Sequence, residues 1–358
     1  MNYDEGEIKN IHYGDILVKF DSIIDINNPE VPFITGGKAE DYYKSQLLKN
    51  GDIIIADTAE DETTGKAVEI TGISDNYVVS GLHTMVARPN ETFAQGYLGY
   101  YLNSQAYRNQ LLPLMQGIKV LSLSKTNMAK TIVAFPKDAT EQTAIGKFFR
   151  TLDDLLTLHK RKLEGLKELK RGYLQQMFPQ KGERIPRVRF DGFVGDWEER
   201  KFGEVLAVNS GRDYKHLNSG NIPVYGTGGY MLSVNESISK VDAIGIGRKG
   251  TIDKPQLLSA PFWTVDTLFF MTPISNYNLL YMYALSQNIE WAKMDESTGV
   301  PSLSKINIEN IDISMPNSIE QAAIGNFFRN LDSLISAQNK KLNQLKELKS
   351  AYLQKMFI

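Results

Sequence analysis

Two short loops carry the residues best suited to binding phosphate groups, and they share one pattern. Gln116-Gly-Ile-Lys leads into Ser122-Leu-Ser-Lys, and Ser297-Thr-Gly leads into Ser302-Leu-Ser-Lys. Backbone amides, hydroxyls and an ammonium at a helix boundary are groups that contact phosphate, but the same residue types also cap helices and build turns. Both interpretations stay open for Lys119, Ser122, Ser124, Lys125, Ser302, Ser304 and Lys305.

A second set of candidates lies on glycine-rich turns. Gly245-Ile-Gly-Arg-Lys-Gly matches the GxGxxG pattern after a strand-like run, but a dinucleotide loop also needs a helix directly afterwards. Pro255 and Pro261 follow instead, so we interpret this segment as a tight turn that displays two basic side chains. Another glycine loop begins at Tyr225. The candidate contact residues on these two loops are Tyr225, Thr227, Arg248 and Lys249.

Catalytic patterns are missing from the sequence. The acidic run at 59–62 with Lys66 nearby could suggest a nuclease, but contiguous loop carboxylates are usually solvated, and they can instead accept hydrogen bonds from cytosine amino groups. There is no P-loop, no GxSxG elbow and no Asn/Asp-Pro-Pro-aromatic tetrapeptide, and the four histidines lack metal-ligand spacing. We therefore expect a binding module with no catalytic residue, no metal site and no cofactor of its own.

Composition and charge set the class of the protein. The chain has 358 residues, 42% hydrophobic and 23% charged, which suits two globular domains. It has no cysteine, no apolar run long enough to span a bilayer and no signal-peptide pattern at its N-terminus, so a cytoplasmic location is expected. The net charge of −2 hides an alternation: residues 1–140 carry 12 basic and 18 acidic residues, whereas 141–189 carry 12 and 6.

An internal repeat sets the architecture. Residues 141–178 and 320–357 agree at 23 of 38 positions without a gap, and apolar residues recur in both at three- and four-residue steps. This spacing predicts two long amphipathic helices that pack against each other as an antiparallel coiled coil with pseudo-two-fold symmetry. The residues expected to pack are Ile145, Phe149, Leu152, Leu156, Leu163, Leu166, Ile324, Phe328, Leu331, Ile335, Leu342 and Leu345.

The regions before each repeat are predicted to be mixed α/β heads, one at each end of the helical pair. Strand-like runs occur at 50–58, 66–73 and 76–87, and again at 222–226, 241–247 and 262–271; each set is followed by a helical stretch, at 97–112 and 278–294. We expect five parts: a first head at 1–139, a helix at 140–178, a basic linker at 179–196, a second head at 197–318 and a helix at 319–358.

The chain resembles the specificity subunit (HsdS) of type I restriction–modification systems. Three features carry the resemblance: the order of these parts, the repeated EQxAIGxFFRxLD…KLxxLKELKxxYLQxMF, and the linker RVRFDGFVGDWEERKFGEV. The resemblance implies two target recognition domains that each read half of a split double-stranded DNA sequence. It implies spacer helices that bind two methyltransferase (HsdM) subunits, with restriction (HsdR) subunits joining. S-adenosylmethionine, ATP and Mg are expected in those partners, which carry adenine-N6 methylation and cleavage, and no membrane is expected.

One departure from the family pattern is visible. The second half opens with about twenty residues, from Trp197 to Leu217, before Ser219-Gly-Asn-Ile, whereas the first half begins near the matching Glu5-Gly-Glu-Ile. We therefore expect a first domain that is shortened at its N-terminus. Two other functions stay open: a self-contained DNA methyltransferase or nuclease, and a coiled-coil scaffold that binds no DNA.

Overall fold

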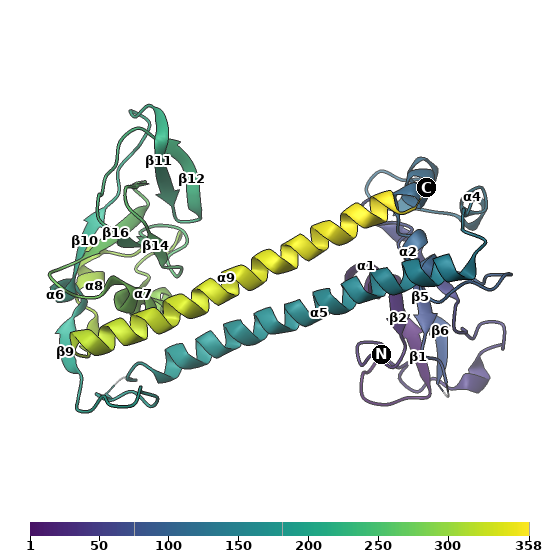
Figure 1. Ribbon diagram of the computed structural model, residues 1–358, viewed down its shortest axis with the longest axis horizontal. Helices are drawn as coiled ribbons and strands as arrows, with labels where there is room; N and C mark the ends of the chain where they lie inside the picture. The colour runs from purple at the N-terminus through teal and green to yellow at the C-terminus, as the bar shows by residue number, and fades with distance from the viewer. Residues whose placement is uncertain (75, 181, 358) are drawn as a thin grey trace. The chain divides into compact units, whose positions relative to one another are not determined.

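The computed structural model describes residues 1–74, 76–180 and 182–357 and divides the chain into two compact units (Figure 1). Unit 1 comprises Met1–Arg161 with Lys340–Ile358, and unit 2 comprises Lys162–Asn339. Each unit thus combines one of the expected heads with a section of both long helices. The fold is mixed α/β, as predicted.

Unit 1 is built on a four-stranded sheet in the order β2 (Ile23–Asp25), β5 (Ala67–Thr71), β3 (Ile53–Ala56) and β7 (Thr84–Ala87). β1 (Ile8–Ile11) pairs with β6 (Tyr77–Ser80), and β4 (Thr58–Ala59) pairs with β8 (Leu121–Ser122). Short helices complete the unit: α1 (Tyr13–Val18), α2 (Tyr97–Tyr101), α3 (Gln105–Leu111), α4 (Lys125–Met128) and the 3₁₀ turns Ala39–Asp41 and Leu112–Leu114. The buried faces of β3 and α2 form its main core with the long helices.

Unit 2 also has a four-stranded central sheet, and a three-stranded sheet lies beside it. Its central sheet has the order β10 (Leu206–Ser210), β16 (Leu268–Pro273), β13 (Ala243–Gly247) and β14 (Gln256–Leu258). A second sheet contains β12 (Gly229–Val234), β11 (Ser219–Gly226) and β15 (Trp263–Thr264), and β9 (Glu198–Lys201) pairs with β17 (Asp312–Met315). The helices are α6 (Phe202–Val205), α7 (Leu279–Gln287), the 3₁₀ helix Trp291–Met294 and α8 (Lys305–Glu309).

Three of the expected strands, at 50–58, 76–87 and 262–271, and both expected head helices are broken in the structure. The run at 76–87 is two strands, β6 and β7, because the chain turns between them and His83 adopts a φ of 55°. The stretch at 97–112 divides where Ser104 accepts a hydrogen bond from the amide of Tyr107 and so starts a new helix, α3. These predictions failed because apolar content continues across the breaks, whereas turn geometry is decided by local hydrogen bonds.

The two long helices, α5 (Ala139–Gln176) and α9 (Ser318–Lys355), each have 38 residues, close to the expected bounds. Within unit 1, Phe148 of α5 packs edge-on against Tyr352 of α9, with ring centroids 4.9 Å apart. Within unit 2, the repeat-equivalent pair Tyr173 and Phe327 packs the same way at 5.0 Å. A second contact in each unit, Asp153 with Lys349 or Lys170 with Asp332, shows that the numbering rises along one helix as it falls along the other, so the pairing is antiparallel in each unit, as expected. The pseudo-two-fold relation of the whole chain stays a prediction.

The same ion pair also occurs once in each unit. Lys349 of α9 pairs with Asp153 of α5 in unit 1, and their repeat equivalents Lys170 and Asp332 pair in unit 2. The lysine is the last residue of the repeated LKELK motif. The twelve residues predicted to pack are all buried or half-buried; Leu156, Leu166 and Ile335 are the half-buried ones.

Replacing Lys349 by methionine should destabilise unit 1 by about 3 kcal/mol at pH 7–8, because the Asp153 carboxylate would stay buried without its partner. Burial already raises the pKa of Asp153, and Lys349 opposes that shift. Without the lysine the folded-state pKa rises further above the unfolded value, so the loss should shrink as the pH falls toward 5 and the carboxyl protonates. Urea denaturation followed by circular dichroism tests this, with the exposed Lys346→Met as control. An equal loss at pH 5 and pH 8 would show that the charge is not responsible.

Candidate nucleic-acid interface

In both units the Ser-Leu-Ser-Lys loop is attached to the end of the central strand. In unit 2 the amide of Leu303 donates to the carbonyl of Arg248 at 2.9 Å, and Lys249 lies opposite Ser302 in an antiparallel bridge. In unit 1 the amide of Leu123 donates to the carbonyl of Asp57 at 2.8 Å, where β4 pairs with β8. The repeated loop therefore has the same structural position twice, immediately beside the residues that leave β3 or β13.

The capping interpretation is correct for two of the four serines. Ser124 accepts a hydrogen bond from the amide of Asn127 at 3.1 Å and begins α4, and Ser304 accepts one from the amide of Asn307 at 3.2 Å and begins α8. Ser122 exchanges backbone hydrogen bonds with Gln116, and its hydroxyl donates to the same carbonyl at 3.3 Å. These bonds give the loop its shape, so phosphate contact by the serines stays a prediction.

The lysines of these loops are exposed. Lys119, Lys125 and Lys249 lie at the surface, and Lys305 forms a surface ion pair with Glu309 one turn along α8 at 3.5 Å. Such an exposed pair contributes about 0–1 kcal/mol, so a phosphate can replace the carboxylate at small cost. The lysines predicted to contact phosphate are thus accessible in both units, and the contacts themselves stay a prediction.

Arg248 directly follows the last residue of β13, and its side chain packs against an aromatic ring. Its guanidinium lies over the ring of Phe269, 5.7 Å from the centroid, on the neighbouring strand β16. Gly250 has a φ of +95°, and a Cβ at Gly247 would lie 1.9 Å from the carbonyl oxygen of Thr251. No helix begins in residues 248–255. The glycines therefore build a turn that displays the arginine, as predicted, and not a dinucleotide loop.

The second glycine loop is tied to the same sheet. The side-chain amide of Gln256 on β14 donates to the carbonyls of Gly226 and Thr227 at 3.1 Å each, and Gln256 lies opposite Gly245 on β13. Tyr225 is held within β11 and is half-buried. The predicted contact residue Thr227 thus lies beside the central sheet. The other predicted contact residue of this loop, Tyr225, lies within a strand.

Unit 1 presents the opposite charge at the equivalent point. Asp57 occupies the place of Arg248, and the Nδ1 atom of His83 lies 3.5 Å from its carboxylate. The acidic run follows directly, and hydrogen bonds from Thr63 lower the pKa of Asp61. The sequence analysis missed Asp57, because its equivalence to Arg248 depends on strand register and not on any shared motif.

The acidic run does not have the arrangement of a nuclease site. Lys66, the lysine that a nuclease site would use, donates to the carbonyl of Leu17 at 3.2 Å instead of to a carboxylate. Among the described residues, no group of three or more histidine, aspartate or glutamate side chains could hold a metal ion. The run therefore remains available only as an acceptor surface.

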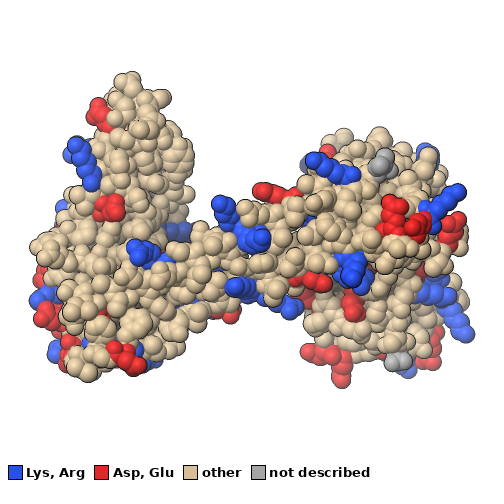
Figure 2. Space-filling view, viewed as in Figure 1, with Lys and Arg blue, Asp and Glu red and all other residues tan. Residues whose placement is uncertain are grey.

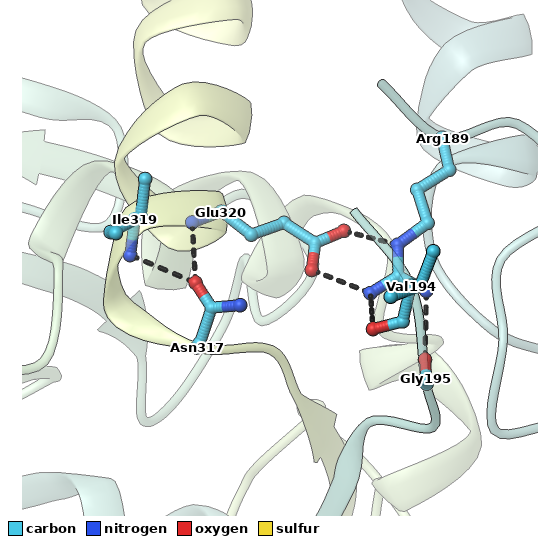
Figure 3. Close-up of polar contacts among 6 residues, drawn as sticks. All are labelled: Arg189, Val194, Gly195, Asn317, Ile319 and Glu320. Carbon is cyan, nitrogen blue, oxygen red and sulfur yellow. Dashed lines mark hydrogen bonds and ion pairs between the residues drawn. The ribbon is translucent and has the colours of Figure 1, made fainter. Parts of the chain in front are cut away.

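The basic linker is part of the structure of unit 2. Figure 3 shows the guanidinium of Arg189 forming two hydrogen bonds with the carboxylate of Glu320, at 2.7 and 2.8 Å, and donating to the carbonyls of Val194 and Gly195. Asn317 accepts from the amides of Ile319 and Glu320 and so caps α9. Arg189 thus ties the linker 179–196 to the first turn of α9, and Lys181 lies outside the described residues.

Comparison with known proteins identifies the family. The model of the type I restriction modification DNA specificity domain matches residues 2–168 and again 195–347, which together cover most of the chain. The chain belongs to this family.

Relatives and solved structures agree with that assignment. A Methanocaldococcus jannaschii protein, the candidate specificity subunit of the type I restriction enzyme MjaX, is 21% identical over 92% of this chain and 82% of its own length. The S subunit of a type I restriction–modification system from M. genitalium has the same fold, with a TM-score of 0.64 at 19% identity over 99% of this chain and 89% of that one. A structure described as showing complex assembly of the type I R-M system gives 0.56 at 16% identity, over 96% and 90%.

The surface of this specificity-domain protein mixes both charges. On the face shown in Figure 2, acidic and basic side chains are interspersed and do not form one continuous basic patch. With a net charge of −2, the chain attracts DNA only weakly at long range, so affinity must come from local contacts or from partners. None of the described helices is long and apolar enough to cross a membrane.

Proposed function

We propose that this chain is the DNA-specificity subunit of a type I restriction–modification complex and that each unit reads one half of a bipartite target. One observation carries the proposal beyond family membership. The same Ser-Leu-Ser-Lys loop is fixed beside the central strand in both units, while the residue at the strand's end is Arg248 in one and Asp57 in the other. A loop that is the same in both units, beside a residue that differs between them, suits recognition of two different half-sites.

The chemistry of the two readers differs in a defined way. An arginine can donate two hydrogen bonds to guanine O6 and N7 in the major groove, whereas a carboxylate accepts from the cytosine amino group. The loop lysines contact phosphates and fix the orientation of the duplex without reading sequence. Lys119 and Lys125 serve unit 1 in this way, and Lys249 and Lys305 serve unit 2.

The long helices provide the surface for partner subunits. Three leucines of the repeated apolar pattern on α5 and α9 are exposed: Leu169, Leu334 and Leu348. Residues of an apolar helical stripe that stay exposed in one chain are suited to packing against a partner. We place two methyltransferase subunits (HsdM) there, one for each copy of the repeat, with restriction subunits (HsdR) joining the assembled complex.

Catalysis belongs to those partners in this proposal. The methyltransferase subunits bind S-adenosylmethionine and methylate adenine at N6, and the restriction subunits use ATP and Mg, all in the cytoplasm. The chain itself supplies recognition only. Methyl transfer from labelled S-adenosylmethionine by the purified chain alone would favour a self-contained methyltransferase instead, and absence of sequence-specific DNA binding by the assembled complex would favour the scaffold.

Replacing both Lys125 and Lys305 by alanine should weaken DNA binding by the assembled complex equally for all sequences. Each lost phosphate contact removes about 0.9 from the slope of log K against log salt concentration, so the double variant should flatten the slope by about 2. Fluorescence anisotropy titrations between 50 and 200 mM salt measure this. Lys19→Ala, which removes a lysine paired with Asp15 on α1, is the matched control. An unchanged slope in the double variant would remove these lysines from the interface.

A further inference from the structure

The turn between β6 and β7 places a histidine beside Asp57, the residue that follows β3. The Nδ1 atom of His83 lies 3.5 Å from the Asp57 carboxylate, and 59% of the histidine side chain is exposed. The amide of Asp57 also donates to the backbone carbonyl of His83 at 3.0 Å. The two residues are therefore joined through both their main chains and their side chains, and the imidazole reaches the surface.

The backbone of His83 has a conformation that favours glycine. Its φ of 55° lies in the left-handed region, where a side chain costs free energy. Among the described residues other than glycine, only Ser275 also has a positive φ. Backbone conformations of this kind are concentrated at functional sites, where a side chain must point in one direction. A histidine at this point of the turn thus indicates a use for the imidazole.

Aromatic packing holds the imidazole although it is exposed. The ring of Tyr13, at the start of α1, packs edge-on against the ring of His83, with centroids 5.3 Å apart. Tyr13 also contacts His12, whose ring centroid lies 4.5 Å away, and the Nδ1 atom of His12 accepts a hydrogen bond from the amide of Gly14 at 3.3 Å. The contacts of His83 with Asp57 and Tyr13 therefore limit the rotation of its ring.

Unit 2 has a different pair of residues at the two equivalent positions. There the amide of Arg248 donates to the carbonyl of Thr267 at 2.8 Å, as the amide of Asp57 does to that of His83. The register of the strand pairs β3–β7 and β13–β16 agrees with this correspondence. The residues beside the repeated Ser-Leu-Ser-Lys loop therefore differ between the units as a pair, Asp57 with His83 in one unit and Arg248 with Thr267 in the other.

Asp57 and His83 together present an acceptor and a donor. The carboxylate can accept a hydrogen bond from the amino group of cytosine. An imidazole that carries protons on both nitrogens can face the carboxylate with Nδ1 and donate from Nε2 to another group. The major-groove edge of a C·G pair has the matching order, because the cytosine amino group lies beside the guanine acceptors O6 and N7. In an A·T pair the thymine methyl group replaces the second acceptor, so the charged imidazole favours C·G.

We propose that His83 is a second base-reading residue of unit 1 and that it reads the same base pair as Asp57. Asp57 accepts from the amino group of cytosine, and Nε2 of the protonated His83 donates to N7 of the guanine in that pair. The inference rests on the proposed function, because it concerns the duplex that the assembled complex binds. It adds to that function a named base pair, C·G, and the two residues that share it.

Competition binding of the assembled complex to duplexes that vary one base pair at a time tests the proposal. Asp57→Ala and His83→Gly should each relax discrimination at the same C·G pair by about tenfold, as expected for the loss of one base contact. Glycine adopts a φ of 55° without cost, so His83→Gly removes the ring and keeps the turn. The control is His216→Ala, because His216 is an exposed histidine of unit 2 whose ring also packs edge-on, against Trp263. It should leave the reading of this base pair unchanged.

Replacing the guanine of this pair by 7-deazaguanine removes only the N7 acceptor. The modified base should weaken binding of the original chain about fivefold, as expected for the loss of one hydrogen bond. It should have no further effect on the His83→Gly variant, since the donor is already missing. A histidine that only shaped the turn would leave the response to 7-deazaguanine unchanged.

The outcomes separate this inference from the proposed function. The inference would be wrong if the complex bound DNA specifically but His83→Gly relaxed no base pair, or a different one from Asp57→Ala. It would also be wrong if the shared pair were A·T, or if the His83→Gly variant stayed as sensitive to 7-deazaguanine as the original chain. In each of these cases the proposed function would stand. If the assembled complex showed no base preference at all, the proposed function would fail, and the inference with it.

Discussion

Replacing Glu320 by alanine is expected to destabilise unit 2 by about 3–5 kcal/mol, because it leaves the largely buried guanidinium of Arg189 without its carboxylate. The loss is larger than for an ordinary ion pair since Glu320 is fully buried and accepts two hydrogen bonds. All three tryptophans, Trp197, Trp263 and Trp291, lie in unit 2. Tryptophan fluorescence during urea denaturation therefore reports this unit selectively.

The matched control is Asp312→Ala, which breaks the surface ion pair with Lys201 in the same unit. Exposed pairs contribute about 0–1 kcal/mol, so this variant should unfold close to the original chain. If Glu320→Ala unfolded at the same urea concentration as Asp312→Ala, the linker would not hold the start of α9 as described.

Replacing Arg248 by alanine should relax discrimination at one base position of one half-site by about tenfold to a hundredfold, while the other half-site stays unchanged. The side chain is exposed and supported by Phe269, so its loss should affect recognition and not folding. Competition binding of the assembled complex to duplexes that vary one base at a time measures the change.

Arg200→Ala is the control for Arg248, because Arg200 is also an exposed arginine of unit 2, on β9, where it pairs with Glu198. We expect it to leave base preference intact. If the Arg248→Ala variant still discriminated fully between bases at every position of the target, the glycine turn would have only a structural role. Asp57→Ala offers the corresponding test in unit 1, where the affected base should belong to the other half-site.

The long helices could be predicted from the sequence because the apolar residues that pack between them recur at the same spacing in both copies of the repeat. The apolar spacing gave their bounds within three residues, and each copy of the LKELK motif supplies one lysine, Lys170 or Lys349, that pairs with an aspartate of the other helix. Leu169, Leu334 and Leu348 follow the same spacing yet are 42–54% exposed. Periodicity alone does not separate a residue that packs against the other helix from one that faces solvent or a partner.

The candidate site was only partly predictable. The repeated serines and lysines could be found by alignment, but their attachment to the ends of β3 and β13 depends on pairing between residues more than fifty positions apart. Asp57 was missed for that reason. The role of Arg189 was also hidden, since a basic linker and a buried ion pair have the same composition, and only the contact with Glu320 distinguishes them.

The central claim is that the two units of this chain read two halves of a DNA target. The most direct test is to map the methylated adenines in the genome of cells that carry the chain with its methyltransferase partner. The map is then compared with that of the same cells after deletion of the chain. The account predicts a bipartite motif that disappears on deletion and that changes in one half only when Arg248 is replaced by alanine. Methylation that persists without the chain, or a single continuous motif that both units affect alike, would contradict it.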